Sequence, residues 1–343
     1  MKLTILFGGA SYEHEISIVS AITVMEKLHS FDLNFIFCDQ DHQFYKIDNK
    51  EMKAKSFSTG SHKKMPRLHV TKGGFELRKT FSKELIDAPV LNLIHGGDGE
   101  DGAIASILDF YDIAFIGPRK EASVFSFDKG YTKWLAESLG VKTVAYEILR
   151  QGDKVGMSLP IIIKPARLGS SIGVSIVKEE SELDYALDVA FEFDERVLVE
   201  PFIIGVKEYN LAGTSLKNGL KYSIVEEPEK REFLDFDKKY RDFSRSSKAN
   251  EAVLDDLMVE KLQHAFSKIY TGLFEGALIR CDFFEIDGDV YLNEINPIPG
   301  SMAHYLFEDF DGLIRELLLN LPKQKRPQVS YQYIHSINQA KGK

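Results

Sequence analysis

Short β-rich runs alternate with helical periods through the first hundred residues, and this alternation limits the possible folds more than any other feature. The apolar run Leu3–Phe7 stops at two glycines, and apolar residues then recur at helical spacing from Ile18 to Met25. A second apolar run, Leu33–Phe37, follows. This order predicts a strand, a covering helix and a parallel strand. With a further strand at Val90–Ile94, the block is predicted to form an open parallel sheet.

The lysine-rich stretch from Asp39 to Lys72 interrupts this pattern. It is mostly polar, and Phe44-Tyr45 and Leu68–Val70 are its short β-rich runs. We predict an inserted hairpin and loop here, outside the core.

A second unit is predicted from about Ser123, where the pattern changes. One helix is expected to run to Leu139, and Ser181 with Asp184 resembles a capping box that opens another. Strands are predicted at Leu159–Ile163, Val174–Val177 and Arg196–Glu200.

The last third of the chain contains one long segment without a period. Glu226–Asn250 is charged and contains a proline, so we predict a long loop that serves as a lid. A helix over 258–269 and a hairpin that turns at Asp287-Gly288 are predicted after it. The tail after Pro322 is basic and is expected to be only partly ordered.

Length and charge limit the partners of the chain. Its 343 residues predict two to three domains. The net charge of −9 argues against binding to nucleic-acid phosphates or anionic lipid and favours small molecules. Cys38 and Cys281 are far apart in sequence, so we predict structural cysteines in a reducing compartment. No apolar run approaches the roughly 18 residues of a membrane span, so we expect a cytoplasmic protein that binds neither nucleic acid nor membrane.

Two strand-to-helix turns in the first unit are rich in glycine, Gly8–Ser11 and His95–Gly102. In an open parallel sheet, ligands bind at the carboxyl ends of the strands, where such turns lie. Glu13 and His14 follow the first turn and His95 opens the second, so a ligand there would meet carboxylates and imidazoles. Either turn taken alone is better explained by tight-turn geometry, and the polar side chains beside the two turns favour a site.

The loop Lys164–Gly173 lies between two predicted strands. Its glycines free backbone N–H groups, and Ser170 and Ser171 add hydroxyls, a combination that suits a polyphosphate. Lys164 lies in an apolar strand, where an ammonium needs a partner, and a nucleotide phosphate would be one. An ordinary glycine hairpin is the alternative.

The predicted hairpin near residue 287 carries four polar side chains at alternate positions. Arg280 and Asp282 share one face of the first strand, and Glu294 and Asn296 share one face of the second. Two carboxylates and an amide oxygen suit Mg²⁺, which prefers oxygen ligands. An exposed hairpin face with unrelated polar residues is the alternative.

The length of the turn decides whether these faces coincide. A two-residue loop at Asp287-Gly288 would place Asp282 opposite Asn293 and send Glu294 to the other face. A three-residue loop with Gly288 at the bulge position would bring all four polar side chains together. We predict the three-residue loop.

Five sequence blocks together resemble one enzyme family, the bacterial D-alanine:D-alanine ligases of the ATP-grasp superfamily. The resemblance covers Leu3 to about Leu321 and rests on the order and spacing of the blocks. They are Gly8-Gly9-x-Ser11-x-Glu13-His14-Glu15, His95-Gly96-x-x-Gly99-Glu100-Asp101-Gly102, Asp128-Lys129-x-x-Thr132-Lys133, Lys164-Pro165-Ala166-Arg167-x-Gly169-Ser170-Ser171-x-Gly173 and Asn293-Glu294-Ile295-Asn296-x-x-Pro299-Gly300.

The resemblance implies an α/β and α+β fold, in which a Rossmann-like sheet domain is followed by a two-part ATP-grasp fold. The implied units are a substrate-facing domain at 1–120, a central subdomain with the phosphate loop at 121–206, a C-terminal subdomain with lid and Mg site at 207–325, and a basic tail at 326–343. ATP would phosphorylate one D-alanine, and the amine of a second would attack the acylphosphate to give D-alanyl-D-alanine for peptidoglycan precursor synthesis. A homodimer is also implied.

The resemblance further implies a role for each matching residue. Glu13 would orient the first D-alanine and be linked through Ser170 to Tyr240, and Arg280 and the amide of Gly300 would stabilise the tetrahedral intermediate. The second substrate would lie near His95, Ser301, Tyr305 and Leu306. ATP would be held by Lys129, Lys164, Ser171, Glu200, Phe202, Ile203, Glu208 at the ribose, and Lys239 on the lid. Two Mg²⁺ (or Mn²⁺) ions would be bound by Asp282, Glu294 and Asn296.

The chain departs from the family pattern near the acceptor pocket. Pro297 replaces the usual threonine, Ser301 replaces a large residue, and Tyr305 replaces a serine that commonly contacts the carboxylate of the second substrate. Either Tyr305 or Ser301 could take over that contact. Two alternative functions remain. One is a ligase that uses D-lactate as acceptor, although Tyr240 on the lid favours an amine as the nucleophile. The other is a catalytically silent ATP-grasp regulator.

Overall fold

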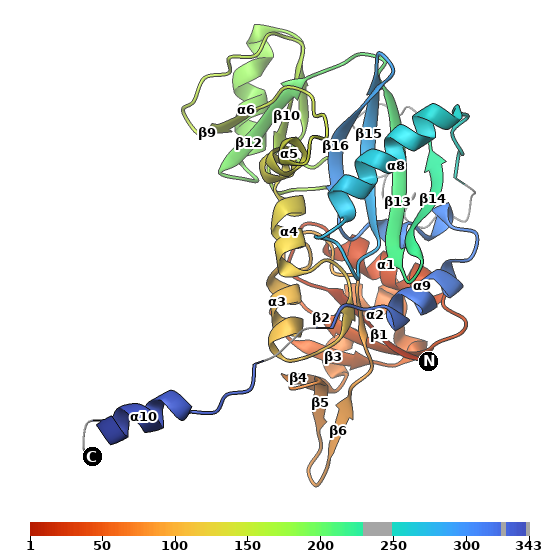
Figure 1. Ribbon diagram of the computed structural model, residues 1–343, viewed down its shortest axis with the longest axis vertical. Coiled ribbons are helices and arrows are strands. Elements are labelled where there is room, and N and C mark those ends of the chain that lie inside the picture. Colours follow the sequence, from red (N-terminus) through yellow and green to blue (C-terminus); the bar gives the residue numbers. More distant parts are fainter. Residues whose placement is uncertain (229–248, 324–326, 341–343) are drawn as a thin grey trace.

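The structure is a computed structural model that describes residues 1–228, 249–323 and 327–340. It contains three sheets, and Figure 1 shows the N-terminal sheet at one end of the long axis and the other two at the opposite end. An α/β unit followed by two α+β units is the architecture predicted from the sequence. No helix within the described ranges is long and apolar enough to cross a membrane.

The N-terminal sheet has eight strands in the order β6-β5-β4-β3-β2-β1-β7-β8. Four of them are parallel, as the sequence predicts: β1 (Lys2–Gly8), β2 (Asp32–Cys38), β7 (Val90–Asn92) and β8 (Phe115–Ile116). Helices α1 (His14–Met25) and α3 (Ala103–Phe110) follow β1 and β7. Both helices therefore start at the edge where the glycine turns lie.

The stretch from Asp39 to Lys72 is part of this sheet, so the prediction of an insertion outside the core is wrong. Strands β3 (Phe44–Ile47), β4 (Arg67–Thr71), β5 (Gly74–Arg78) and β6 (Lys83–Ile86) extend the sheet in antiparallel order. Tyr45 and Ile47 are buried while Lys46 between them is half-buried. In a four-residue strand, buried and exposed side chains alternate too few times for the pattern to be recognised within a lysine-rich segment. Helix α2 (Ala54–Ser58) and the 3₁₀ turns Asn49–Glu51 and Ser61–Lys64 complete the segment.

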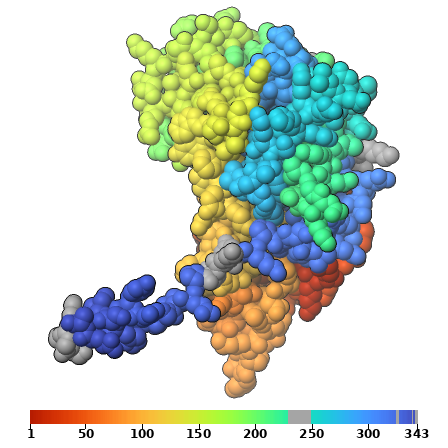
Figure 2. Space-filling view, in the orientation of Figure 1, coloured from red at the N-terminus to blue at the C-terminus, as the bar shows by residue number. Residues whose placement is uncertain are grey.

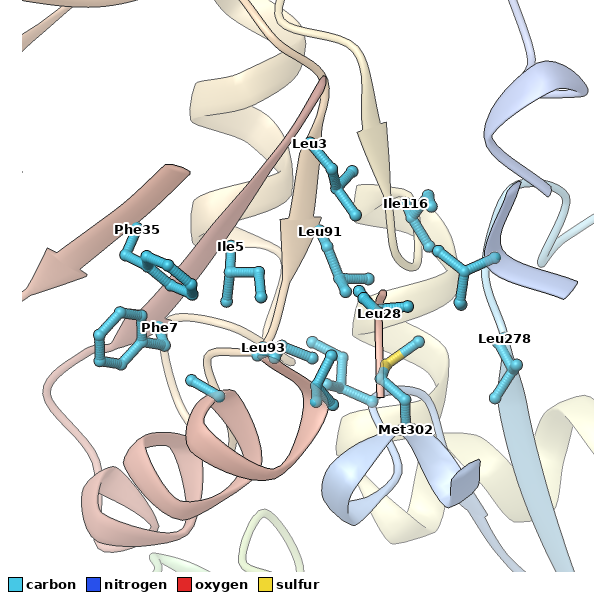
Figure 3. Close-up of a cluster of buried hydrophobic side chains, with 14 of the residues drawn as sticks. Leu3, Ile5, Phe7, Leu28, Phe35, Leu91, Leu93, Ile116, Leu278 and Met302 are labelled. Carbon is cyan, nitrogen blue, oxygen red and sulfur yellow. The ribbon is translucent and has the colours of Figure 1, made fainter. Parts of the chain in front are cut away.

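The core of the N-terminal unit also includes residues from the end of the chain. Leu3 and Ile5 pack in one cluster with Ile116, Leu278 and Met302, as Figure 3 shows. Helix α9 (Phe310–Leu319) contributes to the same cluster. Because the cluster combines residues from the first and the last parts of the chain, it fixes the C-terminal unit against the N-terminal unit.

The central unit has a four-stranded antiparallel sheet in the order β11-β10-β12-β9. Its strands are β9 (Glu147–Arg150), which the sequence did not reveal, β10 (Ile161–Pro165), β11 (Ser175–Val177) and β12 (Arg196–Pro201), and α6 (Leu183–Phe191) follows β11. The capping box before α6 is formed by Glu179 and Glu182, not by Ser181 and Asp184.

The helix predicted to run to Leu139 is two helices, α4 (Lys120–Phe127) and α5 (Lys129–Ser138). Asp128 separates them because its side chain accepts from the N–H groups of Gly130 and Tyr131 and caps α5. The break aims the first turn of α5 at the Gly/Ser loop.

The C-terminal sheet has the order β14-β13-β15-β16, all antiparallel. Its strands are β13 (Lys207–Leu216), β14 (Gly219–Glu226), β15 (Ile279–Ile286) and β16 (Asp289–Asn296), with helix α8 (Asp256–Tyr270) packed on it. The β13–β14 hairpin was not predicted. The lid prediction falls largely on residues 229–248, which lie outside the described residues. The tail contains α10 (Gln332–Ala340), which stands clear of the body in Figure 2.

Candidate functional site

The two glycine turns meet at the carboxyl ends of β1 and β7. Gly8 has a φ of 101°, and a Cβ there would lie 2.0 Å from the carbonyl oxygen of Cys38, so only glycine fits. The chain then turns into α1 and places Glu13 immediately before it. The Ser11 hydroxyl donates to the carbonyl of His95 at 2.7 Å. This bond ties one turn to the other.

The Gly/Ser loop of the central unit reaches across to Glu13. Ser170 and Ser171 both have left-handed φ, and the Ser170 hydroxyl donates to Glu13 Oε1 at 2.5 Å. Gly169 packs against the same carboxylate, because a Cβ there would lie 2.8 Å from Oε1. Burial raises the pKa of Glu13, whereas the Ser170 hydrogen bond and the charge of Lys129 oppose that rise. The structure therefore brings Glu13 and Ser170 together.

Two lysines of the central unit face the same region. Lys129 begins α5, and its ammonium donates to the carbonyl of Leu168 at 2.5 Å. Lys164 lies in β10, and its ammonium is 2.7 Å from Glu200 Oε2. Burial would lower the pKa of Lys164, but the Glu200 carboxylate raises it, so the lysine is charged. The partner that the strand lysine needs is present within the protein.

The carboxylate of Glu200, predicted to line the adenine, is engaged by lysines. Despite burial, Lys164 and Lys133 lower the pKa of Glu200 to about 2. Phe202 and Ile203 follow β12 and are half-buried, and the Phe202 N–H donates to the carbonyl of Pro160.

The hairpin of β15 and β16 brings the four polar side chains onto one face, but not through a three-residue turn. Ile286 pairs with Asp289, so the turn is the two-residue loop Asp287-Gly288, with left-handed φ at both residues. The prediction of a longer loop is therefore wrong. The register instead shifts by one residue between Asp282 and Phe283. Phe283 pairs with Leu292 and Asp282 pairs with Glu294, so Asn293 is the extra residue of a β-bulge. The bulge places Asp282 opposite Glu294.

Within this face, Arg280 and Asn296 contact Asp282. The guanidinium of Arg280 donates to both carboxylate oxygens of Asp282, at 2.7 and 2.8 Å. Asn296 Nδ2 donates to Asp282 Oδ2 at 3.0 Å. Burial would lower the pKa of Arg280, but Asp282 raises it well above its usual value. The arginine is therefore a fixed positive charge at the end of the sheet.

The face is crowded with negative charge. Burial raises the pKa of Asp282, and the neighbouring Glu294 raises it further. Burial, Asp282 and Glu294 together raise the pKa of Glu208 to about 7. Among the described residues, no group of three or more His, Cys, Asp or Glu side chains is arranged to hold a metal ion by itself. Two carboxylates and the amide of Asn296 instead match the chemistry of Mg²⁺, which completes its coordination with phosphate and water.

The segment after β16 packs against helix α1 and reaches this face at Arg280. Ser301, Met302 and Ala303 all have left-handed φ, and the Ser301 N–H donates to the Ser20 hydroxyl at 3.0 Å. Three non-glycine residues in this region are strained, so the contacts around them must hold the segment. The side chain of Tyr305 accepts a hydrogen bond from Arg280, and Leu306 is buried.

His95 supports this segment through a buried chain of hydrogen bonds. Its side-chain Nδ1 lies 2.7 Å from the carbonyl of Leu93, and its Nε2 faces the hydroxyl of Ser20 at 3.4 Å. The imidazole also hydrogen-bonds the backbone of Pro299, so it contacts the segment after β16 directly as well as through Ser20. Burial lowers the pKa of His95 to about 4. His95 thus acts on Ser301 through Ser20.

This burial predicts an acid-sensitive contribution to stability. The unfolded chain takes up a proton on His95 below its ordinary pKa of about 6.5, whereas the folded chain does so only near 4, so folding is disfavoured as the pH falls between these values. Between pH 7 and pH 5 the loss from this residue is expected to be about 2 kcal/mol. Urea unfolding at pH 7 and at pH 5 measures this loss. The free energy of unfolding of His95→Asn should fall less between the two pH values than that of the natural chain. An equal acid loss in the two proteins would contradict this assignment.

Several residues near the site were missed or given no role from the sequence. Lys133 is fully buried and paired with Glu200. Asn210 on β13 pairs in register with Asp282 and donates to Glu226 at 3.0 Å. The position of Asn210 could not be predicted because the β13–β14 hairpin was not predicted. Lys133 could have been singled out, because it is the last residue of its sequence block. Lys239 and Tyr240 lie outside the described residues.

Comparisons with known proteins agree along the whole chain. The family model described as D-ala D-ala ligase N-terminus matches residues 2–118, and the model described as D-ala D-ala ligase C-terminus matches residues 135–310. A D-alanine--D-alanine ligase of Sulfurimonas denitrificans is 61% identical over 345 residues, and one of Helicobacter hepaticus is 54% identical over 351, with all of each chain covered.

Solved structures show the same fold. The D-alanine-D-alanine ligase from Helicobacter pylori superposes with a TM-score of 0.84 at 47% identity, covering 95% of this chain and 100% of that one. A D-Ala:D-Ser ligase from Enterococcus faecalis gives a TM-score of 0.74 at 25% identity, covering 93% of this chain and 98% of that one. These matches confirm the family resemblance and the ATP-grasp fold, and the chain belongs to the D-alanine–D-alanine ligase family.

Proposed function

We propose that this chain joins two D-alanine molecules into D-alanyl-D-alanine with hydrolysis of ATP to ADP and phosphate, for peptidoglycan precursor synthesis in the cytoplasm. The observation that carries the proposal is the convergence of all three units on one place. The Ser170 hydroxyl of the central unit donates to Glu13 of the N-terminal unit at 2.5 Å, and the Lys164 ammonium of the central unit lies 3.5 Å from Asn293 Oδ1 of the C-terminal unit. The division into units at residues 120, 206 and 325, and the homodimer, belong to the same proposal.

The convergence assigns one substrate group to each set of side chains. The ammonium of the first D-alanine would bind the carboxylate of Glu13, which the Ser170 hydroxyl holds in place. Lys129 and Lys164 would bind the phosphates, with Ser171 in the loop and Lys239 on the lid. Glu200 would border the nucleotide site together with Phe202, Ile203 and Glu208. Asp282, Glu294 and Asn296 would hold two Mg²⁺ (or Mn²⁺) ions, which when bound supply neutralisation of phosphate charge.

The reaction then needs positioning and charge neutralisation more than covalent help from the protein. A carboxylate oxygen of the first D-alanine attacks the γ-phosphorus, and the bond from that phosphorus to ADP breaks. The amine of the second D-alanine attacks the resulting acyl carbon, loses a proton, and phosphate leaves. The guanidinium of Arg280 and the N–H of Gly300 would stabilise the oxyanion of the tetrahedral intermediate. Ser170, Tyr240 and the lid would keep water away from the acylphosphate.

Tyr305 is better placed than Ser301 to bind the carboxylate of the second D-alanine. Its phenol accepts from Arg280, so it lies beside the fixed positive charge of the face. Ser301 is 1% exposed and its N–H is used by Ser20. His95 would act by supporting this segment, and Leu306 by packing behind it.

Tyr305→Phe is therefore expected to raise the KM for the second D-alanine about tenfold, since it removes one hydrogen bond to a carboxylate. The KM for ATP should stay unchanged. Ser301→Ala is the matched control and should leave both values unchanged. Initial-rate kinetics over a range of D-alanine concentrations measure the effect. The reverse pattern, with Ser301→Ala raising the KM, would transfer the contact to Ser301.

Phosphate release from ATP with D-alanine, L-alanine or D-lactate supplied singly, and the products identified by mass, tests the proposed reaction. D-alanine alone should support release, with D-alanyl-D-alanine as the product. A mixed D-alanine and D-lactate reaction that gave mainly the ester would favour the D-lactate alternative. Tight ATP binding without turnover on any of them would favour the silent regulator.

A further inference from the structure

We propose that Lys133 is a positioning residue that holds Glu200 and the Asn293 bulge in one arrangement, so that Lys164 faces the nucleotide phosphates while Glu294 faces Asp282. This inference deepens the proposed function and rests on it. It assigns a task to a fully buried lysine of helix α5, which contacts Glu200 of the central unit and the carbonyls of Leu292 and Asn293 of the C-terminal unit.

The first observation is the burial of a charged pair. The side chain of Lys133 is 0% exposed, that of Glu200 is 2% exposed, and the ammonium and carboxylate are 2.5 Å apart. A buried ammonium is costly unless it is paired and hydrogen-bonded. Such a pair adds little net stability relative to apolar residues, which favours a positioning task over a purely stabilising one.

The second observation is the way the pair shares its charge. Glu200 Oε1 contacts Lys133, and Oε2 contacts Lys164 at 2.7 Å. Two ammonium groups and one carboxylate leave one net positive charge. Lys164 is the more exposed of the two lysines, at 13%, so the surplus charge is presented there. Without Lys133, Glu200 would neutralise Lys164.

The third observation is that the same ammonium contacts the bulge. The Nζ of Lys133 donates to the carbonyls of Leu292 and Asn293, both at 3.4 Å. Asn293 is the extra residue that places Asp282 opposite Glu294, and its side-chain oxygen lies 3.5 Å from the Lys164 ammonium. Lys133 therefore contacts both the partner of the nucleotide lysine and the backbone that sets the register of the carboxylate face.

The test is nucleotide binding, measured apart from turnover. Calorimetric titration of the full chain with a non-hydrolysable ATP analogue and Mg²⁺ should show about tenfold weaker binding for Lys133→Met, because the charge facing the phosphates is lost. The double variant Lys133→Met with Glu200→Gln restores one net positive charge at Lys164 and should recover most of the affinity. Lys142→Met, which removes an exposed lysine paired with Asp289, is the matched control and should bind as the natural chain does.

Kinetics separate positioning from general damage to the fold. In Lys133→Met the KM for ATP should rise about tenfold, while the KM for the first D-alanine, which faces Glu13, should stay within about twofold. The proposal would be overturned if Lys133→Met bound the ATP analogue as tightly as the natural chain does. It would also be overturned by a double variant no better than the single one, or by equal rises in both KM values. If the natural chain bound the analogue but made no D-alanyl-D-alanine, the proposed function would fail while the binding comparison still tested Lys133.

Discussion

Replacing Arg280 with methionine is expected to lower kcat/KM for D-alanine about 10³-fold. The guanidinium is held by two hydrogen bonds to Asp282 and faces Tyr305, so its charge is fixed where an oxyanion would develop. The loss of a preorganised oxyanion donor costs about 10²- to 10³-fold, and the acceptor site loses a charge as well. Coupled phosphate-release kinetics measure the effect. Arg150→Met, which changes an exposed arginine, is the control and should keep its activity.

The same substitution should destabilise the fold by about 3–5 kcal/mol, because it leaves the buried Asp282 carboxylate without its partner. Thermal unfolding with and without Mg²⁺ distinguishes this effect, since a bound cation would partly replace the lost charge. A variant that retained activity within about tenfold would contradict the placement of Arg280 at the reacting carbonyl.

Replacing Glu294 with glutamine is expected to separate activity from stability. Turnover should fall by more than about 10³-fold, because the side chain proposed to bind the divalent cations would lose its charge. In the absence of Mg²⁺ the variant should be more stable than the natural chain. Glu294 raises the pKa values of Asp282, Glu13 and Glu208, so its removal relieves repulsion among buried carboxylates.

Thermal unfolding in chelator and turnover in saturating Mg²⁺ are the two measurements for this variant. Lower stability in chelator would show that Glu294 is structural, and retained turnover would show that it holds no metal ion. Asp289→Asn, which changes an exposed carboxylate on the same strand, should alter neither property.

The sequence predicted which side chains share one face of the hairpin better than it predicted how the backbone brings them together. Asp282 and Glu294 do share a face, but through a bulge at Asn293 rather than through a longer turn. A bulge is hard to predict from a single sequence because many residue types can occupy it. The pair Asp-Gly, by contrast, directly indicates a turn. The break at Asp128 was missed because one capping residue interrupts an otherwise continuous helical period.

The unpredicted parts share a physical cause, which is dependence on contacts distant in sequence. Lys133 closes one of the recognised sequence blocks, but its task depends on Glu200 and Asn293, which are distant in sequence. The strands β13 and β14 escaped prediction, although Lys207–Leu216 is buried over most of its length. The contact of Ser170 with Glu13 was expected only from the family resemblance, because nothing in the glycine loop itself indicates which distant carboxylate it meets.

The central claim is that the chain transfers phosphate from ATP to the carboxylate of D-alanine before the peptide bond forms. D-alanine labelled with ¹⁸O in both carboxylate oxygens tests this directly when the released phosphate is analysed by mass. One ¹⁸O atom is expected in each phosphate, since the carbon–oxygen bond of the acylphosphate breaks when the second D-alanine attacks. Phosphate without label, formed together with D-alanyl-D-alanine, would contradict the central claim.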